Sequence, residues 1–157
     1  MKKVFKLNNL LQIIIELKKE EKIVGFANGC FDLLHKGHIF LLSEAKKNCD
    51  FLIVGLNSDF SVKSLKGKSR PIDNEKNRID NLLKKTQVDA IILFSEDTPI
   101  NLITNLSPNI LFKGSDYINK EVVGSSYIKE KNGKTIFINI IDGYSTTNII
   151  NKSSINS

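Results

Sequence analysis

Cysteine is scarce in this chain of 157 residues, which contains only Cys30 and Cys49. Two cysteines are too few for a disulfide framework and are typical of the reducing cytoplasm, where we expect this protein to work. No apolar run reaches the ~18 residues that span a bilayer, so we expect no membrane partner. The N-terminus is basic and then apolar, but Gln12 and Glu16 interrupt it and no small-residue cleavage site follows, which argues against a signal peptide.

Aromatic residues are also few, at 8% of the chain with no tryptophan, and the lysines are spread along the sequence. No stacking platform for bases is visible, and we therefore expect no nucleic-acid partner. The net charge of +6 still favours anionic partners in general, including phosphorylated small molecules. Charge alone leaves a basic nucleic-acid- or lipid-binding module without chemistry as an alternative to an enzyme.

Several familiar nucleotide and metal motifs are missing. Residues 67–69 read GKS, as at the end of a P-loop, but Val62 stands where that loop requires its upstream glycine. No GxGxxG follows the first predicted strand, and neither HExxH nor CxxC occurs. We therefore expect neither a dinucleotide fold of the GxGxxG type nor a metal held by the protein.

The chain does have a regular alternation of helical and strand patterns. Apolar periodicity predicts helices over residues 8–20, 37–47, 74–85, 97–106 (with Asp97 or Thr98 as N-cap) and 122–131. Short apolar runs predict strands over residues 22–27, 51–56, 88–94, 109–114 and 134–140. We expect a long polar loop over 57–73 and a last helix over 146–152, capped by Ser145. This alternation predicts an α/β fold, a five-stranded parallel sheet with helices on both faces.

Ligands of such sheets bind outside the carboxyl ends of the strands. Polar segments follow the predicted strands at residues 28–38, 57–70, 114–116 and 142–147. We expect one cleft to collect all four.

Both histidines of the chain, His35 and His38, lie in the first of these segments, with Gly37 between them. As metal ligands they lack a third partner, since the chain has no other histidine and no CxxC. A buried structural pair explains neither their pairing nor the glycine. A phosphate site explains more, because a helix N-terminus offers free N–H groups and a positive dipole end, and glycine permits close approach.

The histidine segment carries a resemblance. HKGH at residues 35–38 matches the HxGH signature of the nucleotidyltransferase superfamily. The chain resembles the bacterial ADP-heptose synthases, the D-glycero-β-D-manno-heptose 1-phosphate adenylyltransferases, without the kinase domain often fused to them. The resembling segments, in order, are NGCFDLLHKGH (28–38), VGLNSD (54–59), LKGKSRP (65–71), EDTP (96–99), LFKGSDY (111–117) and DGYSTTNII (142–150).

The chain departs from this family at two positions. Ser115 stands where the family usually has a second glycine, and Tyr144 where it often has cysteine. The related glycerol-3-phosphate cytidylyltransferases usually carry an arginine before the glycine of the late motif, whereas residues 139–143 here read NIIDG. The missing arginine favours the heptose branch and leaves a cytidylyltransferase acting on glycerol 3-phosphate, or a similar small phosphate, as the alternative.

The resemblance implies a Rossmann-like fold of nucleotidyltransferase type in a single domain over residues 1–157, with 1–21 as an N-terminal helical extension and 22–150 as the catalytic core. It implies that the phosphate oxygen of a sugar 1-phosphate attacks the α-phosphorus of ATP and releases pyrophosphate. Such a transfer depends on positioning and charge stabilisation. Mg²⁺ is expected with ATP, held mainly by phosphate and water. A separate heptose kinase is expected to supply the acceptor.

The resemblance also implies roles for individual residues. His35 and His38 are expected to hold the reacting phosphates, and Lys66 to close over them, with Lys63, Lys68 and Arg70 as further candidates. The expected nucleotide- or phosphate-binding residues are Asn28, Gly29, Cys30, Phe31, Asp32, Gly37, Arg70, Ser145, Thr146 and Thr147; the expected substrate-binding residues are Asp59, Lys63, Gly114 and Asp116.

Three assignments stay open at this point. Asp32 either orients a phosphate-binding turn or caps it structurally. Arg78 either reaches the phosphates or, as we favour, is a charge on a helix face. The N-terminal helix has more apolar surface than one small sheet needs, which suggests a homodimer.

Overall fold

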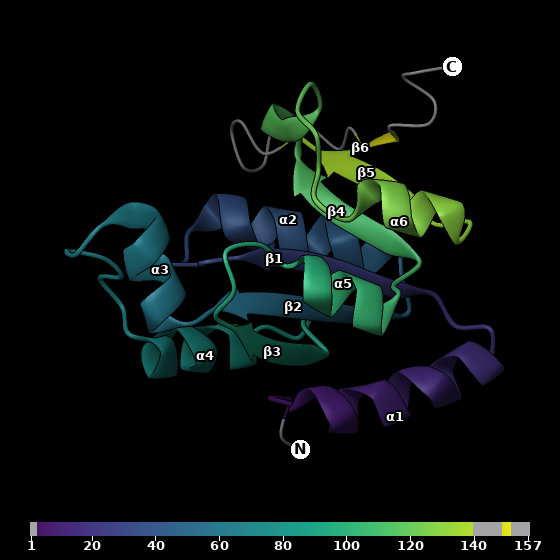
Figure 1. Ribbon diagram of the computed structural model, residues 1–157, viewed down its shortest axis with the longest axis horizontal. Coiled ribbons are helices and arrows are strands. Elements are labelled where there is room, and N and C mark those ends of the chain that lie inside the picture. The colour runs from purple at the N-terminus through teal and green to yellow at the C-terminus, as the bar shows by residue number, and fades with distance from the viewer. Residues whose placement is uncertain (1–2, 140–148, 152–157) are drawn as a thin grey trace.

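The computed structural model describes residues 3–139 and the backbone of residues 149–151. Its sheet contains β1 (Val24–Gly29), β2 (Phe51–Asn57), β3 (Ala90–Phe94), β4 (Ile110–Gly114), β5 (Lys134–Ile138) and β6 (Ile149–Asn151), in the order β3-β2-β1-β4-β5-β6 (Figure 1). The first five strands are parallel, as predicted, and β6 pairs antiparallel with β5. The predicted α/β class is therefore confirmed, with one strand more than expected.

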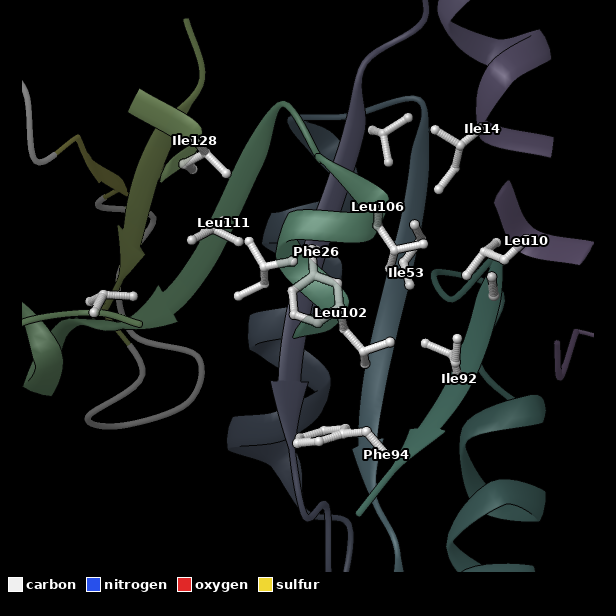
Figure 2. Packing of buried hydrophobic residues seen from close by; sticks show 14 of the residues in the cluster. Leu10, Ile14, Phe26, Ile53, Ile92, Phe94, Leu102, Leu106, Leu111 and Ile128 are labelled. Atoms are coloured by element: carbon white, nitrogen blue, oxygen red, sulfur yellow. The ribbon is translucent and has the colours of Figure 1, made fainter. Parts of the chain in front are cut away.

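Helices cover both faces of the sheet. One face carries α1 (Leu7–Lys19), α5 (Ile100–Leu106) and α6 (Ser125–Glu130); the other carries α2 (Lys36–Lys47) and α4 (Glu75–Leu83). Alternate strand residues supply the two cores, so that Phe26 belongs to the first and Ala27 to the second. Figure 2 shows the first core, where Leu10 of α1 and Leu102 of α5 point toward the strands.

The strand β6 corrects the predicted last helix over residues 146–152. Ile149 and Ile150 lie opposite Ile138 and Phe137 of β5, at what would otherwise be an open sheet edge. β-Branched residues favour strands, and so short an apolar run does not distinguish strand from helix by its own pattern.

A second correction concerns the predicted loop over residues 57–73, which contains the helix α3 (Asp59–Lys66). The Ser58 hydroxyl accepts a hydrogen bond from the backbone N–H of Ser61 at 3.2 Å and caps this helix. Ser61 and Val62 are its buried residues, so the apolar signal is too small to give helical periodicity. Ser58 was the one feature of the sequence that indicated the start of this helix.

Two further helices start later than predicted. The helix α5 begins at Ile100 with Pro99 as its N-cap, so the predicted N-cap, Asp97 or Thr98, is wrong. The helix α6 begins at Ser125 because Gly124, with φ of 86°, adopts a left-handed conformation just before it.

The N-terminal helix α1 packs on the sheet. Its Leu10 and Ile14 are buried in the first core, and Leu7, Leu11 and Leu17 are partly buried against it. The sheet thus covers most of the apolar surface that suggested a homodimer, which stays a prediction, as do the predicted domain limits. None of the helices in the described part of the chain has the length and apolar character of a membrane span.

The order of the strands creates a crevice. From β1 the chain proceeds through β2 and β3 on one side, and then returns to β4 and β5 on the other. The loops after β1 and β4 therefore leave in opposite directions, which is where ligands of open α/β sheets bind. This point lies at the carboxyl edge of the sheet, beside the N-terminus of α2.

Candidate functional site

The two histidines form the N-terminal cap of α2. The Nδ1 atom of His35 accepts a hydrogen bond from the backbone N–H of Gly37 at 3.0 Å. The Nδ1 atom of His38 accepts one from the backbone N–H of His35 at 3.3 Å. Because both Nδ1 atoms act as acceptors, the ring proton that either imidazole keeps lies on Nε2. Each imidazole therefore has an N–H left to donate to a ligand.

The rings of His35 and His38 are stacked, with centroids 3.8 Å apart and an angle of 25° between their planes. Gly37 makes this possible, because a Cβ atom there would lie 2.9 Å from Cε1 of His35. The structure thus adds a second explanation for glycine at position 37. Besides the predicted close approach of a phosphate, the absence of a side chain leaves room for the His35 ring that caps the helix.

The pKa of His38 is lowered to about 4. Desolvation by burial is the largest cause, followed by the nearby charges of His35 and Lys66. His38 is therefore neutral at pH 7, with the single proton that the hydrogen bonding assigns to Nε2.

A hollow of about 430 Å³ opens at this helix end. It gathers most of the predicted phosphate-binding residues, since it is lined by Asn28, Gly29, Cys30, Phe31, Asp32, Leu33, His35, His38, Leu41, Lys66 and Arg70. Of the basic candidates after β2, Lys66 and Arg70 line the hollow, whereas the exposed Lys63 and Lys68 do not. Ser145, Thr146 and Thr147 lie outside the described residues.

Asp32 holds the loop after α3 against the loop after β1. Its side chain is only 1% exposed. Its carboxylate accepts hydrogen bonds from Nε of Arg70 and the backbone N–H groups of Ile72 and Asp73, each at 2.9 Å. Desolvation raises the pKa of Asp32, but these hydrogen bonds and the charge of Arg70 outweigh it and leave the pKa below its ordinary value. These contacts give Asp32 a structural role between two loops, and its predicted role at a phosphate stays a prediction.

Arg78 is the main residue that sequence reasoning misjudged. It is fully buried rather than a charge on a helix face. Its guanidinium donates to three backbone carbonyls and one carboxylate: Cys30 O at 2.9 Å, Asn57 O at 2.7 Å, Asp73 O at 3.0 Å and Asp59 Oδ1 at 2.7 Å. The spacing in the sequence indicated this burial. Arg78 lies four residues before the buried Leu82, and residues four apart share one face of a helix.

Arg78 ties the ends of β1 and β2 to the loop before α4. The carboxylate of the predicted substrate ligand Asp59 is engaged by this arginine, and Asp59 does not line the hollow. Its substrate role stays a prediction.

The end of β4 contributes a residue that the sequence argument did not select. Nζ of Lys113 donates a hydrogen bond to Oδ1 of Asn28 at 3.0 Å, across the crevice between β4 and β1. The predicted substrate residues Gly114 and Asp116 follow it, Gly114 buried and Asp116 exposed in the short helix η1 (Ser115–Tyr117). Neither lines the hollow at the histidines.

The described residues offer few side chains that could bind a metal ion. Within the described part of the chain, no group of three or more histidine, cysteine, aspartate or glutamate side chains is placed to hold a metal ion. Asp32, the carboxylate of the hollow, is engaged by Arg70 and two backbone N–H groups. These residues fit a Mg²⁺ ion carried by substrate phosphates better than one with its own protein ligands.

The sequence is similar to those of known nucleotidyltransferase-type proteins. The cytidylyltransferase-like family model matches residues 26–152. The bifunctional protein HldE of Helicobacter pylori is 54% identical over 142 residues, covering 90% of this chain and 30% of that protein. The bifunctional protein HldE of Campylobacter fetus is 48% identical over 151 residues, covering 96% and 31%. The chain thus spans about three tenths of the length of these relatives.

Solved structures agree with the fold. The lipopolysaccharide core biosynthesis protein of Thermoplasma volcanium matches with a TM-score of 0.59 and 30% identity, over 71% of this chain and 90% of that one. The pantoate-beta-alanine ligase of Francisella tularensis matches with a TM-score of 0.64 over 88% of this chain and 67% of that one. At 18% identity, the ligase supports the shared fold alone.

Proposed function

Since this chain belongs to the cytidylyltransferase-like family and is a nucleotidyltransferase, we propose that it transfers AMP from ATP to D-glycero-β-D-manno-heptose 1-phosphate. The products are ADP-heptose and pyrophosphate. The ADP-heptose then serves as a precursor for the synthesis of lipopolysaccharide or another surface glycan. Family membership disfavours the alternative of a basic binding module without chemistry. A separate heptose kinase as the source of the acceptor is part of the proposal.

The observation that carries the proposal is the histidine pair at the start of α2. Its Nδ1 atoms accept from backbone N–H groups, which leaves two Nε2–H donors beside a hollow that Lys66 and Arg70 also line. Donors fixed in this way stabilise charge on a phosphate without reorganising during the reaction. The low pKa of His38, about 4, keeps its proton arrangement constant at neutral pH.

In the proposed reaction, a phosphate oxygen of the acceptor forms a bond to the α-phosphorus of ATP. The bond from that phosphorus to the bridging oxygen of the β-phosphate breaks, and pyrophosphate leaves with the electron pair. His35 and His38 donate to the α-phosphate oxygens, where the transition state is most crowded. Lys66, exposed at the end of α3 and lining the same hollow, contributes positive charge. If Mg²⁺ binds with ATP, phosphate oxygens and water would hold it, and it would supply positive charge near the leaving group.

The choice of heptose and ATP rests on the resemblance, above all on DGYSTTNII at 142–150 and the missing arginine before Gly143. A second candidate, CTP with glycerol 3-phosphate, uses the same histidines and the same chemistry. A site built around sugar hydroxyls rejects an acceptor that lacks them, because its own polar groups are then left unpaired.

The test is a matrix of ATP and CTP against D-glycero-β-D-manno-heptose 1-phosphate and glycerol 3-phosphate, with Mg²⁺ present and pyrophosphate release as the readout. We expect the pair of ATP and heptose 1-phosphate to lead by orders of magnitude. A lead for CTP with glycerol 3-phosphate would reject the heptose assignment and leave the proposed role of the histidines intact. The His38→Ala variant controls for contaminating pyrophosphate release.

A further inference from the structure

The sheet opens between β1 and β4 before either strand ends. Backbone pairing between them comprises Gly25↔Ile110 and Phe26↔Leu111. On the outer sides pairing runs further, to Gly29↔Leu56 between β1 and β2 and to Gly114↔Ile138 between β4 and β5. The register would place Asn28 opposite Lys113 in the opened part, and there their side chains meet, with Nζ 3.0 Å from Oδ1. A lysine therefore lies in the crevice where ligands of this fold class bind.

Within residues 3–139, Lys113 has no charge partner in close contact. Among the ion pairs of residues 3–139, none involves Lys113, and its one hydrogen bond there is to the neutral amide of Asn28. Tyr117 offers only a ring face, with its centroid 5.2 Å from Nζ. Burial lowers the pKa of Lys113, and the nearby charge of Asp116 opposes that effect without an ion pair. A partly buried ammonium in this situation is costly unless a ligand supplies negative charge.

The position of Lys113 separates it from the cations assigned to ATP. Lys66 and Arg70 belong to α3 and the loop after it, and they line the hollow together with the histidines. Lys113 belongs to β4, and this strand lies on the other side of β1 from β2 (Figure 1). Asn28 connects the two, because it lines the hollow and also accepts the hydrogen bond from Lys113. Asn28 thus has the cations of the hollow near it and Lys113 bonded to its amide oxygen.

We propose that Lys113 binds the phosphate of the acceptor, exchanging its hydrogen bond to Asn28 for contact with the phosphate oxygens that do not attack. This proposal rests on the proposed function for its reaction. A sugar phosphate and a triphosphate repel each other as they approach, and an ammonium on the acceptor side offsets that repulsion. Lys113 is then a binding and positioning residue for the acceptor, whereas ATP binds without it.

The first test measures the kinetics of the Lys113→Met variant, which keeps an unbranched side chain one heavy atom shorter and removes the charge. We expect the KM for heptose 1-phosphate to rise about 10- to 100-fold, as loss of a hydrogen bond to a charged group does, with the KM for ATP within about twofold. The matched control is Lys120→Met, because Nζ of Lys120 also lies 5.2 Å from the centroid of the Tyr117 ring. We expect the control to behave as the parent protein. An equal rise in both KM values in Lys113→Met would overturn the proposal.

The second test uses inorganic phosphate and does not depend on which acceptor is correct. Calorimetry follows phosphate binding to the protein saturated with α,β-methylene ATP and Mg²⁺. We expect the parent and Lys120→Met to bind phosphate and Lys113→Met to lose that binding, while all three bind the analogue equally. Unchanged phosphate binding in Lys113→Met, or none in the parent, would reject the role of Lys113.

The two proposals fail separately. If the parent shows no turnover with ATP and heptose 1-phosphate, the proposed function fails and the phosphate experiment still decides the role of Lys113. If Lys113→Met does not fold, Lys113→Gln replaces it, since glutamine keeps a donor toward Asn28 and lacks the charge.

Discussion

Replacing Arg78 by methionine is expected to destabilise the protein strongly. The guanidinium is fully buried and makes four hydrogen bonds, to the carbonyls of Cys30, Asn57 and Asp73 and to the Asp59 carboxylate. Methionine fills a similar volume and leaves all four acceptors without that partner. Breaking a buried charge pair from one side costs ~3–5 kcal/mol. Because the Asp59 side chain is 33% exposed and water reaches it, we expect the lower end, about 3 kcal/mol.

The assay is urea unfolding followed by circular dichroism, with thermal unfolding as a second measurement. For a chain of this size, a loss of about 3 kcal/mol corresponds to a fall in Tm of roughly 6–12 °C. Arg78→Lys is expected to lose most of the same stability, because a single ammonium does not reach carbonyls on three different segments.

The matched control is Arg70→Met. Arg70 also pairs with an aspartate, but its side chain is 32% exposed and Asp32 keeps two backbone N–H donors. We expect a smaller loss there, about 1.5 kcal/mol, the lower end for one hydrogen bond to a charged group, because Asp32 keeps its two backbone donors. A free energy of unfolding for Arg78→Met within about 1 kcal/mol of the parent would refute the reasoning.

Three further predictions concern the hollow. His35→Ala and His38→Ala should each lower turnover by about 10²–10³, as loss of a fixed donor to a developing charge does, and folded variants with near-normal turnover would contradict the proposed role. Lys66→Ala should lower turnover while the free energy of unfolding stays within about 0.5 kcal/mol, with the exposed Lys76→Ala as the control that leaves both unchanged; equal turnover in Lys66→Ala would return that lysine to the solvated surface. His38 should titrate in NMR near pH 4 instead of its ordinary 6.5, so that its contribution to stability falls as pH drops from about 6.5 toward 4, and bound ATP should raise this pKa; a midpoint near 6.5 without ligand would be inconsistent with the buried, neutral ring.

The alternation of strands and helices and the place of the histidines were predictable from local patterns in the amino-acid sequence. Buried parallel strands are continuous apolar runs, such as FLIVGL at 51–56, and they are visible without knowledge of their neighbours. His35 and His38 are three residues apart at a helix start, so their mutual geometry depends on local backbone alone. Local patterns of this kind carry the fold class and the centre of the candidate site.

The tertiary structure decided the contacts between distant segments. The bond from Lys113 to Asn28 exists because β4 lies beside β1, and no pattern around either residue shows that adjacency. The burial of Arg78 follows from how α4 docks against the ends of β1 and β2, and the strand β6 follows from the open edge of β5. A side chain's charge and its spacing in the sequence are local properties. Its burial and its partners depend on the order of the strands, and that order depends on interactions between segments far apart in the sequence.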